Sequence, residues 1–407
     1  METFRRLNTV SGDKINVYTG AIALVETGAL YACGDNHSGQ LGLGDNESRS
    51  TLTRVPLEEK AQTVVTGSGF TFVLAVSGAV YSCGYNGSGQ LGLGDRQNRS
   101  TLTRVPLAES VKAVEIGYSS TYVVTVSGAL YACGNNSNGQ LGLGDTQNQS
   151  MFQRVPLEES VKTVVTGNAS TYVLTVSGAL YACGNNRSGS LGLGDLHQRS
   201  TLTRVPLAES AMTIIADHGF TFVITVSGAV YACGDNLFGQ LGFGDYQERS
   251  TLTRVPLEES VKAVVTNNFS THVLAHSGAL YACGNNSFGQ LGIGDKQEKR
   301  PMLRRVPLEE SVKAVVTSGI SIFVITVSGA LYACGYNYYG QLGLGDLSHR
   351  STFTKVPLEE RVQTVVTGND ATYVLTVDGE LYICGDNGYR QLCIGDGSDR
   401  STLTKML

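Results

Sequence analysis

The sequence predicts an all-β protein, specifically a β-propeller of four-stranded antiparallel blades, because of three observations. The hexapeptide Tyr-x-Cys-Gly-x-Asn occurs eight times, in steps of 50 residues except for one step of 51. Each copy lies among short apolar and β-branched segments that Gly, Pro, Asn and Ser separate. These segments are five or six residues long, shorter than a helix needs. A period near 50 indicates one supersecondary unit copied many times. The copies begin at Tyr31, Tyr81, Tyr131, Tyr181, Tyr231, Tyr281, Tyr332 and Tyr382.

One repeat, residues 161–207, shows which strands to expect. The first two strands are 161–166 and 171–176, and a Ser-Gly pair after the second favours a two-residue hairpin turn. The third is 179–183, which a Gly/Asn-rich loop follows. The fourth, 201–205, ends at a proline, which suits an edge strand. Continuous apolar segments are typical of strands buried on both faces, so four-stranded sheets stacked face to face are expected.

Eight blades are expected, in a single propeller domain that spans residues 1–407. Seven internal Val-Pro segments supply the outer strands of seven blades. The eighth outer strand comes from either Thr402–Met406 or Thr3–Leu7, since both resemble the sequence Thr-Leu-Thr-Arg-Val. The alternative is seven blades with one surplus unit.

Composition excludes several classes of protein. The net charge is −5, and no basic block is available to displace counterions from phosphates, so a nucleic-acid partner is not expected. The sequence contains no run of 18 apolar residues, the length that would indicate a membrane-spanning helix.

Eight of the nine cysteines share one repeat position, and equivalent positions lie too far apart for a disulfide. Buried structural thiols and a reducing compartment are therefore expected, with a cytoplasmic location and the nucleus as the alternative. Cys393 stands apart and replaces a motif glycine, in a repeat that also has Arg390 for glycine. We interpret it as part of a decayed motif.

The loop Gly39–Asp45 has the glycine content of a phosphate-binding loop. No helix pattern follows it, no Lys-Ser/Thr pair completes it, and it recurs in every repeat. We expect a structural role instead: glycines adopt positive φ, Leu41 fills the space between blades, and Asp45 and Asn36 bond nearby amides. A calcium-binding β-helix would repeat every nine residues.

No catalytic residue, metal site or cofactor is expected. The six histidines occupy non-equivalent positions, and no Ser/His/Asp or Cys/His arrangement stands out. The protein is therefore expected not to be an enzyme.

The repeat motif resembles that of a known family. The pattern Gly-x-Leu-Tyr-x-Cys-Gly-x-Asn-x-x-Gly-Gln-Leu-Gly-x-Gly-Asp, followed by a Val-Pro strand and Val-x-x-Val-x-x-Gly, is similar to the repeat of the regulator of chromosome condensation family. The resemblance covers essentially the whole chain and implies a circular propeller, usually of seven blades. Members include an exchange factor for the GTPase Ran, domains of giant ubiquitin ligases, a plant UV-B photoreceptor and a bacterial β-lactamase inhibitor. The kelch propeller has a similar period, but its paired glycines and tryptophan are missing here.

The sequence also departs from that family. The His that often ends the first loop is replaced, for example by Phe70, Ser120 and Ala371. Exchange activity in the family relies on an inserted wedge and chromatin binding on a basic N-terminal arm, and neither is visible. Because the chain has no tryptophan, a tryptophan-based photoreceptor is excluded.

Differences between the repeats gather in the first and third connections, which emerge on one face of an up-and-down blade. The third connection is polar or small in the first four repeats and aromatic in the last four. We predict one partner-docking surface there, since exposed aromatic patches mark interfaces. Its residues are Phe220, Phe238, Phe269, Phe288, Ile320, Tyr338, Tyr339 and Tyr389.

The function predicted from these features is a non-catalytic protein–protein interaction propeller, a scaffold that binds another protein and is itself a monomer. The alternative is a small-GTPase regulator or guanine-nucleotide exchange factor of the Ran-regulator type, which the resemblance implies. A weaker alternative is a carbohydrate-binding propeller that uses the Asn and aromatic loops.

Overall fold

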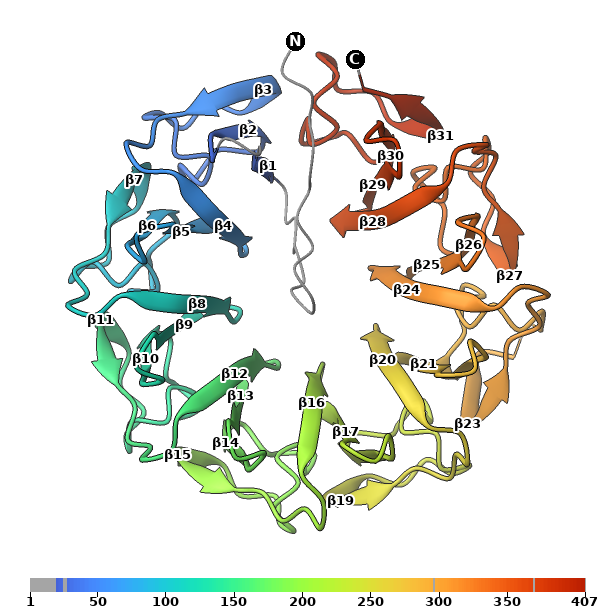
Figure 1. Cartoon of the computed structure of the whole chain (residues 1–407), viewed down its shortest axis with the longest axis horizontal. Coiled ribbons are helices and arrows are strands. Elements are labelled where there is room, and N and C mark those ends of the chain that lie inside the picture. Colours follow the sequence, from blue (N-terminus) through green and yellow to red (C-terminus); the bar gives the residue numbers. More distant parts are fainter. Residues whose placement is uncertain (1–19, 25–27, 296, 369, 407) are drawn as a thin grey trace.

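The strands of this protein form antiparallel sheets that stand around a ring (Figure 1). The computed structural model describes residues 20–24, 28–295, 297–368 and 370–406. All regular elements of the described residues are strands. Every sheet is a simple meander in which strands adjacent in sequence are hydrogen-bonded neighbours.

Seven of the sheets have four strands each, and in each the first strand points toward the centre of the ring (Figure 1). The first sheet consists of β4 (Ala61–Thr66), β5 (Phe70–Ala75), β6 (Val80–Gly84) and β7 (Arg99–Arg104), and the second of β8 (Val111–Ile116), β9 (Ser120–Thr125), β10 (Leu130–Gly134) and β11 (Gln149–Arg154). The third consists of β12 (Val161–Thr166), β13 (Ser170–Thr175), β14 (Leu180–Gly184) and β15 (Arg199–Arg204). The fourth consists of β16 (Ala211–Ala216), β17 (Phe220–Thr225), β18 (Val230–Gly234) and β19 (Arg249–Arg254). The fifth sheet consists of β20 (Val261–Asn267), β21 (Ser270–Ala275), β22 (Leu280–Asn285) and β23 (Lys299–Arg305). The sixth consists of β24 (Val312–Ser318), β25 (Ser321–Thr326), β26 (Leu331–Gly335) and β27 (Arg350–Lys355). The seventh consists of β28 (Val362–Gly368), β29 (Ala371–Thr376), β30 (Leu381–Gly385) and β31 (Arg400–Lys405).

The prediction of eight four-stranded blades is wrong. The structure has seven four-stranded blades, and the first repeat adds a sheet of three described strands, β1 (Gly20–Leu24), β2 (Leu30–Gly34) and β3 (Arg49–Val55). The count differs because β1 matches the second strand of the other repeats, and the residues one strand earlier lie outside the described residues. The alternative, seven blades and a surplus unit, has the correct number of four-stranded blades. The surplus sheet stands in the ring between the blades β4–β7 and β28–β31 (Figure 1).

The C-terminal segment supplies the outer strand of the last blade, as one of the two options predicted. β31 pairs antiparallel with β30, with Tyr382 opposite Lys405. The other option, Thr3–Leu7, lies outside the described residues. In the repeat 161–207 all four strands form within two residues of the predicted bounds.

The core lies between neighbouring blades, which is why the inner strands are apolar on both sides. Every residue of β13 is buried, whereas β15 on the rim is half-buried or exposed. The predicted role of the loop leucine is confirmed: Leu191 packs in one cluster with Val205 of its own repeat and Ile214 of the next. Burying a leucine side chain is worth about 1.5–3 kcal/mol, so each junction gains stability from this one position.

The glycine-rich loop is organised by its own polar side chains, as predicted. The Asn36 side-chain carbonyl accepts a hydrogen bond from the Leu41 amide at 2.9 Å. The side-chain amide group of Asn36 donates a hydrogen bond to the Asp45 backbone carbonyl at 2.9 Å. Asp45 accepts from the Glu47 amide at 2.9 Å and pairs with Arg49 at 2.5 Å. The loop is therefore a structural element that recurs around the ring.

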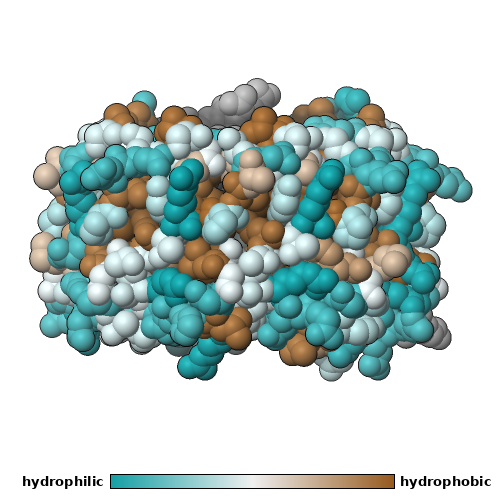
Figure 2. All heavy atoms as spheres, turned by 90° about the horizontal axis from the view of Figure 1, so that it is seen from below, coloured by the Kyte–Doolittle hydropathy of each residue, from teal (hydrophilic) through white to brown (hydrophobic). Residues whose placement is uncertain are grey.

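The rim of the molecule carries apolar surface that hydrophilic side chains interrupt (Figure 2). No helix among the described residues is long and apolar enough to cross a membrane.

The cysteines follow the prediction with one correction. Seven of the repeat cysteines are free and buried, as expected of structural thiols. Cys33, however, is paired with Cys393 in a disulfide, with the two Cα atoms 5.9 Å apart. Equivalent cysteines of successive repeats do lie apart, but Cys393 occupies a different repeat position that faces the next cysteine in the ring. The interpretation of Cys393 as part of a decayed motif did not foresee this disulfide.

Candidate interaction face

The first and third connections of each blade lie side by side on one face, as the meander topology requires. The Asn285 amide, at the start of a third connection, donates to the Phe269 carbonyl at 2.9 Å. The Tyr336 amide donates in the same way to the Ile320 carbonyl at 3.2 Å. Side chains of both variable connections are therefore presented together, and we call this side of the ring the variable face.

One aromatic group on the variable face, the phenylalanine cluster, consists of His218, Phe238 and Phe269. The Phe238 and Phe269 rings stack, with centroids 4.9 Å apart, although they come from neighbouring repeats. The His218 ring lies 5.9 Å from Phe269. The Lys299 ammonium lies 4.5 Å from the Phe238 ring centroid, within the range of a cation–π interaction. The cluster thus combines a partly exposed aromatic surface with a positive charge.

Phe220 does not belong to the surface that the sequence predicted. It is 0% exposed and packs edge-on against Phe222, with centroids 6.1 Å apart. As the first residue of β17 it lies opposite Gly234, within the apolar core between blades. Phe220 supports Phe269 from beneath, at 6.5 Å between centroids, and is a core residue.

A second group, the tyrosine cluster, consists of Phe288, Tyr336, Tyr338, Tyr339 and His349. Tyr336 is at its centre: its ring lies 5.2 Å from Phe288 and 5.0 Å from His349, between centroids. Tyr338 and Tyr339 meet edge-on at 5.2 Å. Tyr338 is 63% exposed, so a large aromatic side chain stands in solvent on top of a supported cluster.

Ile320 and Tyr389 lie outside both clusters. The Ile320 carbonyl adjoins the tyrosine cluster through its bond to the Tyr336 amide. Tyr389 is 49% exposed and makes no ring contact with other described residues. The eight predicted residues therefore divide into one buried phenylalanine, two clusters and two separate side chains.

Sequence reasoning missed Tyr336, His349 and Lys299. Tyr336 and Tyr85 are the two departures from Asn or Asp at the position after Cys-Gly, which is a visible signal. His349 takes the place of Asn98 and Asn148. Its Nδ1 accepts a hydrogen bond from the Asn337 amide at 3.0 Å, as the asparagine oxygens do in their own repeats. A lone lysine among polar loop residues gave no such signal.

Carboxylates border the tyrosine cluster. Burial raises the pKa of Asp370, and its Oδ1 accepts a hydrogen bond from the Gln341 side-chain amide at 2.9 Å. Burial also raises the pKa of Tyr339, with a further contribution from the negative charge of Asp386. The phenylalanine cluster therefore has both the Lys299 ammonium and the Asp217 carboxylate beside it, the latter bonded to His218. The tyrosine cluster has carboxylates beside it.

The opposite side of the ring, which carries the hairpin turns, differs in kind, and we call it the hairpin face. Glu159 accepts hydrogen bonds from Ser177 at 2.5 Å and from Tyr181 at 2.7 Å. The same triad recurs around the ring, for example at Glu209, Ser227 and Tyr231. Hydrogen bonding to these hydroxyls, first to Ser177, lowers the pKa of Glu159. In six of the seven four-stranded blades these three side chains thus satisfy one another.

No group of three or more His, Cys, Asp or Glu side chains that could hold a metal ion is found in the part of the chain that the structure describes. The residues of the variable face offer aromatic surface, two kinds of charge and backbone groups. This arrangement suits binding.

Fold and face together define a repeat propeller with one variable surface, and sequence comparison places it in a family. The model of the RCC1-like domain matches residues 151–406, and the regulator of chromosome condensation (RCC1) repeat matches residues 27–74, 77–126 and 127–174. The chain belongs to the RCC1 repeat family. The resemblance drawn from the sequence is thereby confirmed. A comparison with curated proteins gives no match.

Solved structures show the same fold. Human WBSCR16 is 21% identical, with a TM-score of 0.67 over 86% of this chain and 98% of its own. Yeast RCC1 (Prp20), solved with Kap60, is 18% identical, with a TM-score of 0.65 over 90% and 91%. Prp20p from Saccharomyces cerevisiae, described together with its binding to Gsp1p and histones, is 19% identical, with a TM-score of 0.64 over 88% and 91%.

Proposed function

We propose that this protein is a non-catalytic interaction propeller that binds another protein through the variable face. The observation that carries the proposal is the pair of aromatic clusters on neighbouring blades, from Phe238 to Tyr339. Interface hot spots are enriched in such aromatic side chains, held by neighbours and open to solvent on one side. The Prp20p structure supports the class of partner, because its description names protein partners of that propeller.

The exposed side chains beside the two clusters favour the last repeats as the docking sector. Leu237 is 59% exposed beside the phenylalanine cluster, and Tyr338 is 63% exposed on the tyrosine cluster. Exposed apolar side chains that are contiguous, instead of scattered, mark binding surfaces. The proposed docking residues are Phe238, Phe269, Phe288, Ile320, Tyr338, Tyr339 and Tyr389, with Tyr336 and Leu237 added.

The experiment is affinity capture with single alanine variants of Phe238, Phe288, Tyr338 and Tyr389, combined with thermal melting. We expect each cluster variant to weaken capture, by about 2 kcal/mol or more for a true hot spot. Melting temperature is expected to change little, because the changed atoms are largely at the surface.

Val226→Ala is the matched control. Val226 is 71% exposed on the hairpin face, so its truncation removes exposed apolar surface far from the clusters. Unchanged capture by all four variants would overturn the proposal. Strongly lowered melting temperatures would show that the rings belong to the core.

A second candidate is a regulator of a small GTPase, which the similarity to Prp20p and its named partner Gsp1p favours. The discriminating assay is release of bound guanine nucleotide from a small GTPase in the presence of the full chain. Accelerated release would replace the non-catalytic proposal with exchange activity. Binding without accelerated release would support the interaction role. A glycan array with strong signals would favour the carbohydrate-binding alternative instead.

The proposal includes a monomeric protein in the cytoplasm or nucleus. Light scattering of the purified chain tests the first point, and microscopy of the tagged protein in its own cells tests the second.

A further inference from the structure

Seven junctions between neighbouring repeats share one contact between a glycine and a cysteine. A Cβ atom built on Gly42 would lie 3.3 Å from the Sγ of Cys83 in the next repeat. At the last of these junctions, a Cβ on Gly343 would lie 3.2 Å from Cys384 Sγ. The five others are Gly92 with Cys133, Gly142 with Cys183, Gly192 with Cys233, Gly242 with Cys283 and Gly292 with Cys334.

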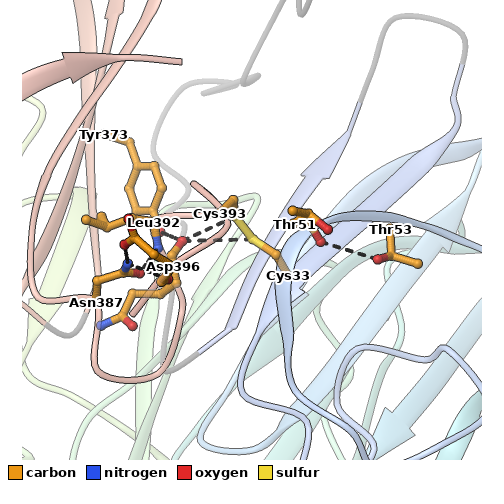
Figure 3. Close-up of a disulfide and its surroundings, with 9 residues drawn as sticks. Cys33, Thr51, Thr53, Tyr373, Asn387, Leu392, Cys393 and Asp396 are labelled. Carbon is orange, nitrogen blue, oxygen red and sulfur yellow. Dashed lines mark hydrogen bonds between the residues drawn. A yellow bond between two sulfur atoms is a disulfide. The ribbon is translucent and has the colours of Figure 1, made fainter. Parts of the chain in front are cut away.

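The eighth junction is the seam where the last repeat meets the first, and here the glycine is replaced by Cys393. The cysteine of the following repeat is Cys33, on β2, and the two sulfurs are bonded (Figure 3). Their Cα separation of 5.9 Å falls in the usual range for a disulfide. A cysteine thus occupies the glycine position at the one junction that closes the ring.

The seam also preserves the contacts of a reduced junction. At the other junctions the thiol donates to the carbonyl of the preceding repeat, as Cys384 does to Gln341 at 3.4 Å. At the seam the Gln391 carbonyl oxygen lies 3.9 Å from Cys33 Sγ and 3.3 Å from Cys393 Sγ. A reduced Cys33 would therefore find the same kind of hydrogen-bond acceptor as its seven equivalents, the backbone carbonyl of the preceding repeat. The structure can accommodate the reduced thiol.

Among the residues that the structure describes, one backbone bridge found at the other junctions is missing at the seam. An isolated β-bridge joins Leu43 to Thr101, and its equivalents join the six later junctions up to Leu344 and Thr402. The corresponding residues Ile394 and Thr51, both described, form no such bridge. The hydrogen bond from the Gly395 amide to the Ser50 carbonyl, at 2.9 Å, is retained. Between described residues, the seam thus lacks one backbone bridge that the other junctions have.

Cys393 also has an unfavourable backbone conformation. Its φ is +58°, in the left-handed region that glycine adopts at the equivalent positions, such as Gly343 with φ of +68°. A cysteine side chain is strained there, whereas glycine is not. The covalent link to Cys33 is a contribution that glycine cannot make at this position.

We propose that Cys33 and Cys393 form a redox-controlled clasp that covalently closes the ring in oxidising conditions and releases the seam in reducing conditions. The reductant is a dithiol. Its first thiolate attacks the sulfur of Cys393, the partly exposed member, and displaces Cys33 as a thiolate, which takes up a proton. The second thiolate of the reductant then attacks the mixed disulfide, which releases Cys393 as a thiol and oxidises the reductant to its cyclic disulfide. A low-molecular-weight disulfide re-forms the bond: the Cys393 thiolate attacks it and displaces one small thiolate, and the Cys33 thiolate then attacks Cys393 in the mixed disulfide and displaces the second.

The first test locates the pair chemically in the full chain. Denaturation without reductant, alkylation and peptide mapping should give one linked peptide pair containing Cys33 and Cys393, with the other seven cysteines alkylated. Alkylation of all nine cysteines, even after incubation with oxidised glutathione, would overturn the proposal.

The second test measures whether the native clasp opens. Dithiothreitol added to the folded protein should lower the melting temperature by about 5 °C or more, because the disulfide closes a loop of 360 residues. Hydrogen exchange should accelerate at the Gly395 amide and in β2 and β3. A disulfide that resists dithiothreitol until the protein is unfolded would be a permanent crosslink, and the proposal would be wrong.

Cys393→Gly restores the motif and is the key variant. It should fold, melt at or above the temperature of the reduced protein, because glycine is unstrained at this φ, and no longer respond to dithiothreitol. Cys83→Ser is the matched control at an ordinary junction, and its response to dithiothreitol should equal that of the unchanged protein. A response of Cys393→Gly equal to that of the unchanged protein would assign the redox effect to other thiols and refute the clasp.

Discussion

The hairpin face and the variable face are built by the same strands, yet they treat polar and apolar groups differently. On the hairpin face, Glu159 is bonded to Ser177 and Tyr181, and five other blades repeat this set. On the variable face, Phe238 and Tyr338 have aromatic neighbours on one side and solvent on the other.

This difference shows how a repeat protein separates stability from recognition. Connections that recur unchanged satisfy their own hydrogen bonds, so they offer a partner little that is unpaired. Connections that vary are free of that role and can carry exposed rings, because a surface ring contributes little to folding. The four predictions that follow test this separation, from the largest expected effect to the smallest.

Phe220→Ala should destabilise the protein by about 3–5 kcal/mol, because it leaves a cavity beneath Phe269 in the core between blades. Phe238→Ala, one connection away on the same face, should cost less than about 1 kcal/mol. Urea unfolding of both variants measures the contrast. Equal losses would mean that the variable face is part of the core, and the separation would fail.

His272 lies beneath the variable face, and its titration should make the free energy of unfolding depend on pH. It is fully buried at the position where Tyr172 donates to the Ser190 carbonyl at 2.8 Å. Its ring nitrogens make no hydrogen bond of normal geometry to described residues. Burial lowers its pKa from 6.5 to about 4, partly opposed by the backbone of Gln290 and Leu291.

Because the folded pKa is depressed, the unfolded chain binds more protons between pH 6.5 and 4. Stability contributed by the neutral imidazole is therefore present above pH 6.5 and is lost as the pH falls to about 4, by roughly 3 kcal/mol. Urea unfolding at pH 7 and pH 4 should show this loss, and His272→Tyr should remove it. An equal loss in the variant would assign the pH dependence to the carboxylates.

Tyr338→Ala should weaken partner capture about 30-fold, the equivalent of 2 kcal/mol, if the last repeats are the docking sector. Tyr118→Ala is its matched control on the same face: Tyr118 is 75% exposed, in a first connection of an early repeat. The ratio of the two dissociation constants measures how local the surface is. Equal weakening by both would spread the interface around the whole variable face.

Glu159→Gln should have the smallest effect, a change of about 1 °C or less in melting temperature, because its bonds are exposed to solvent. Partner capture should not change. The hydroxyl bonds lower the pKa of Glu159, so their small contribution is present at neutral pH and is lost as the pH falls below the ordinary carboxylate range. Lost capture at neutral pH would place the partner on the hairpin face.

The sequence by itself determined the repeat, the strands and the division of connections between two faces. Strand bounds within 161–207 were predictable because Ser-Gly turns, prolines and unbroken apolar segments act locally. Leu191 was predictable as a core residue because the same leucine recurs in every repeat.

Tertiary structure alone decided what depends on contacts between repeats. Phe220 and Phe238 are both aromatic and lie on adjoining connections, yet Phe220 is buried in the core between blades whereas Phe238 is half-buried and stacks on Phe269. His349 joined the tyrosine cluster because its nitrogen replaces an asparagine oxygen 12 residues after Asn337. Cys33 and Cys393 are 360 residues apart, and only closure of the ring brings the first and last repeats together. Local sequence patterns encode a unit, whereas the contacts at a junction follow from the angle at which units stack.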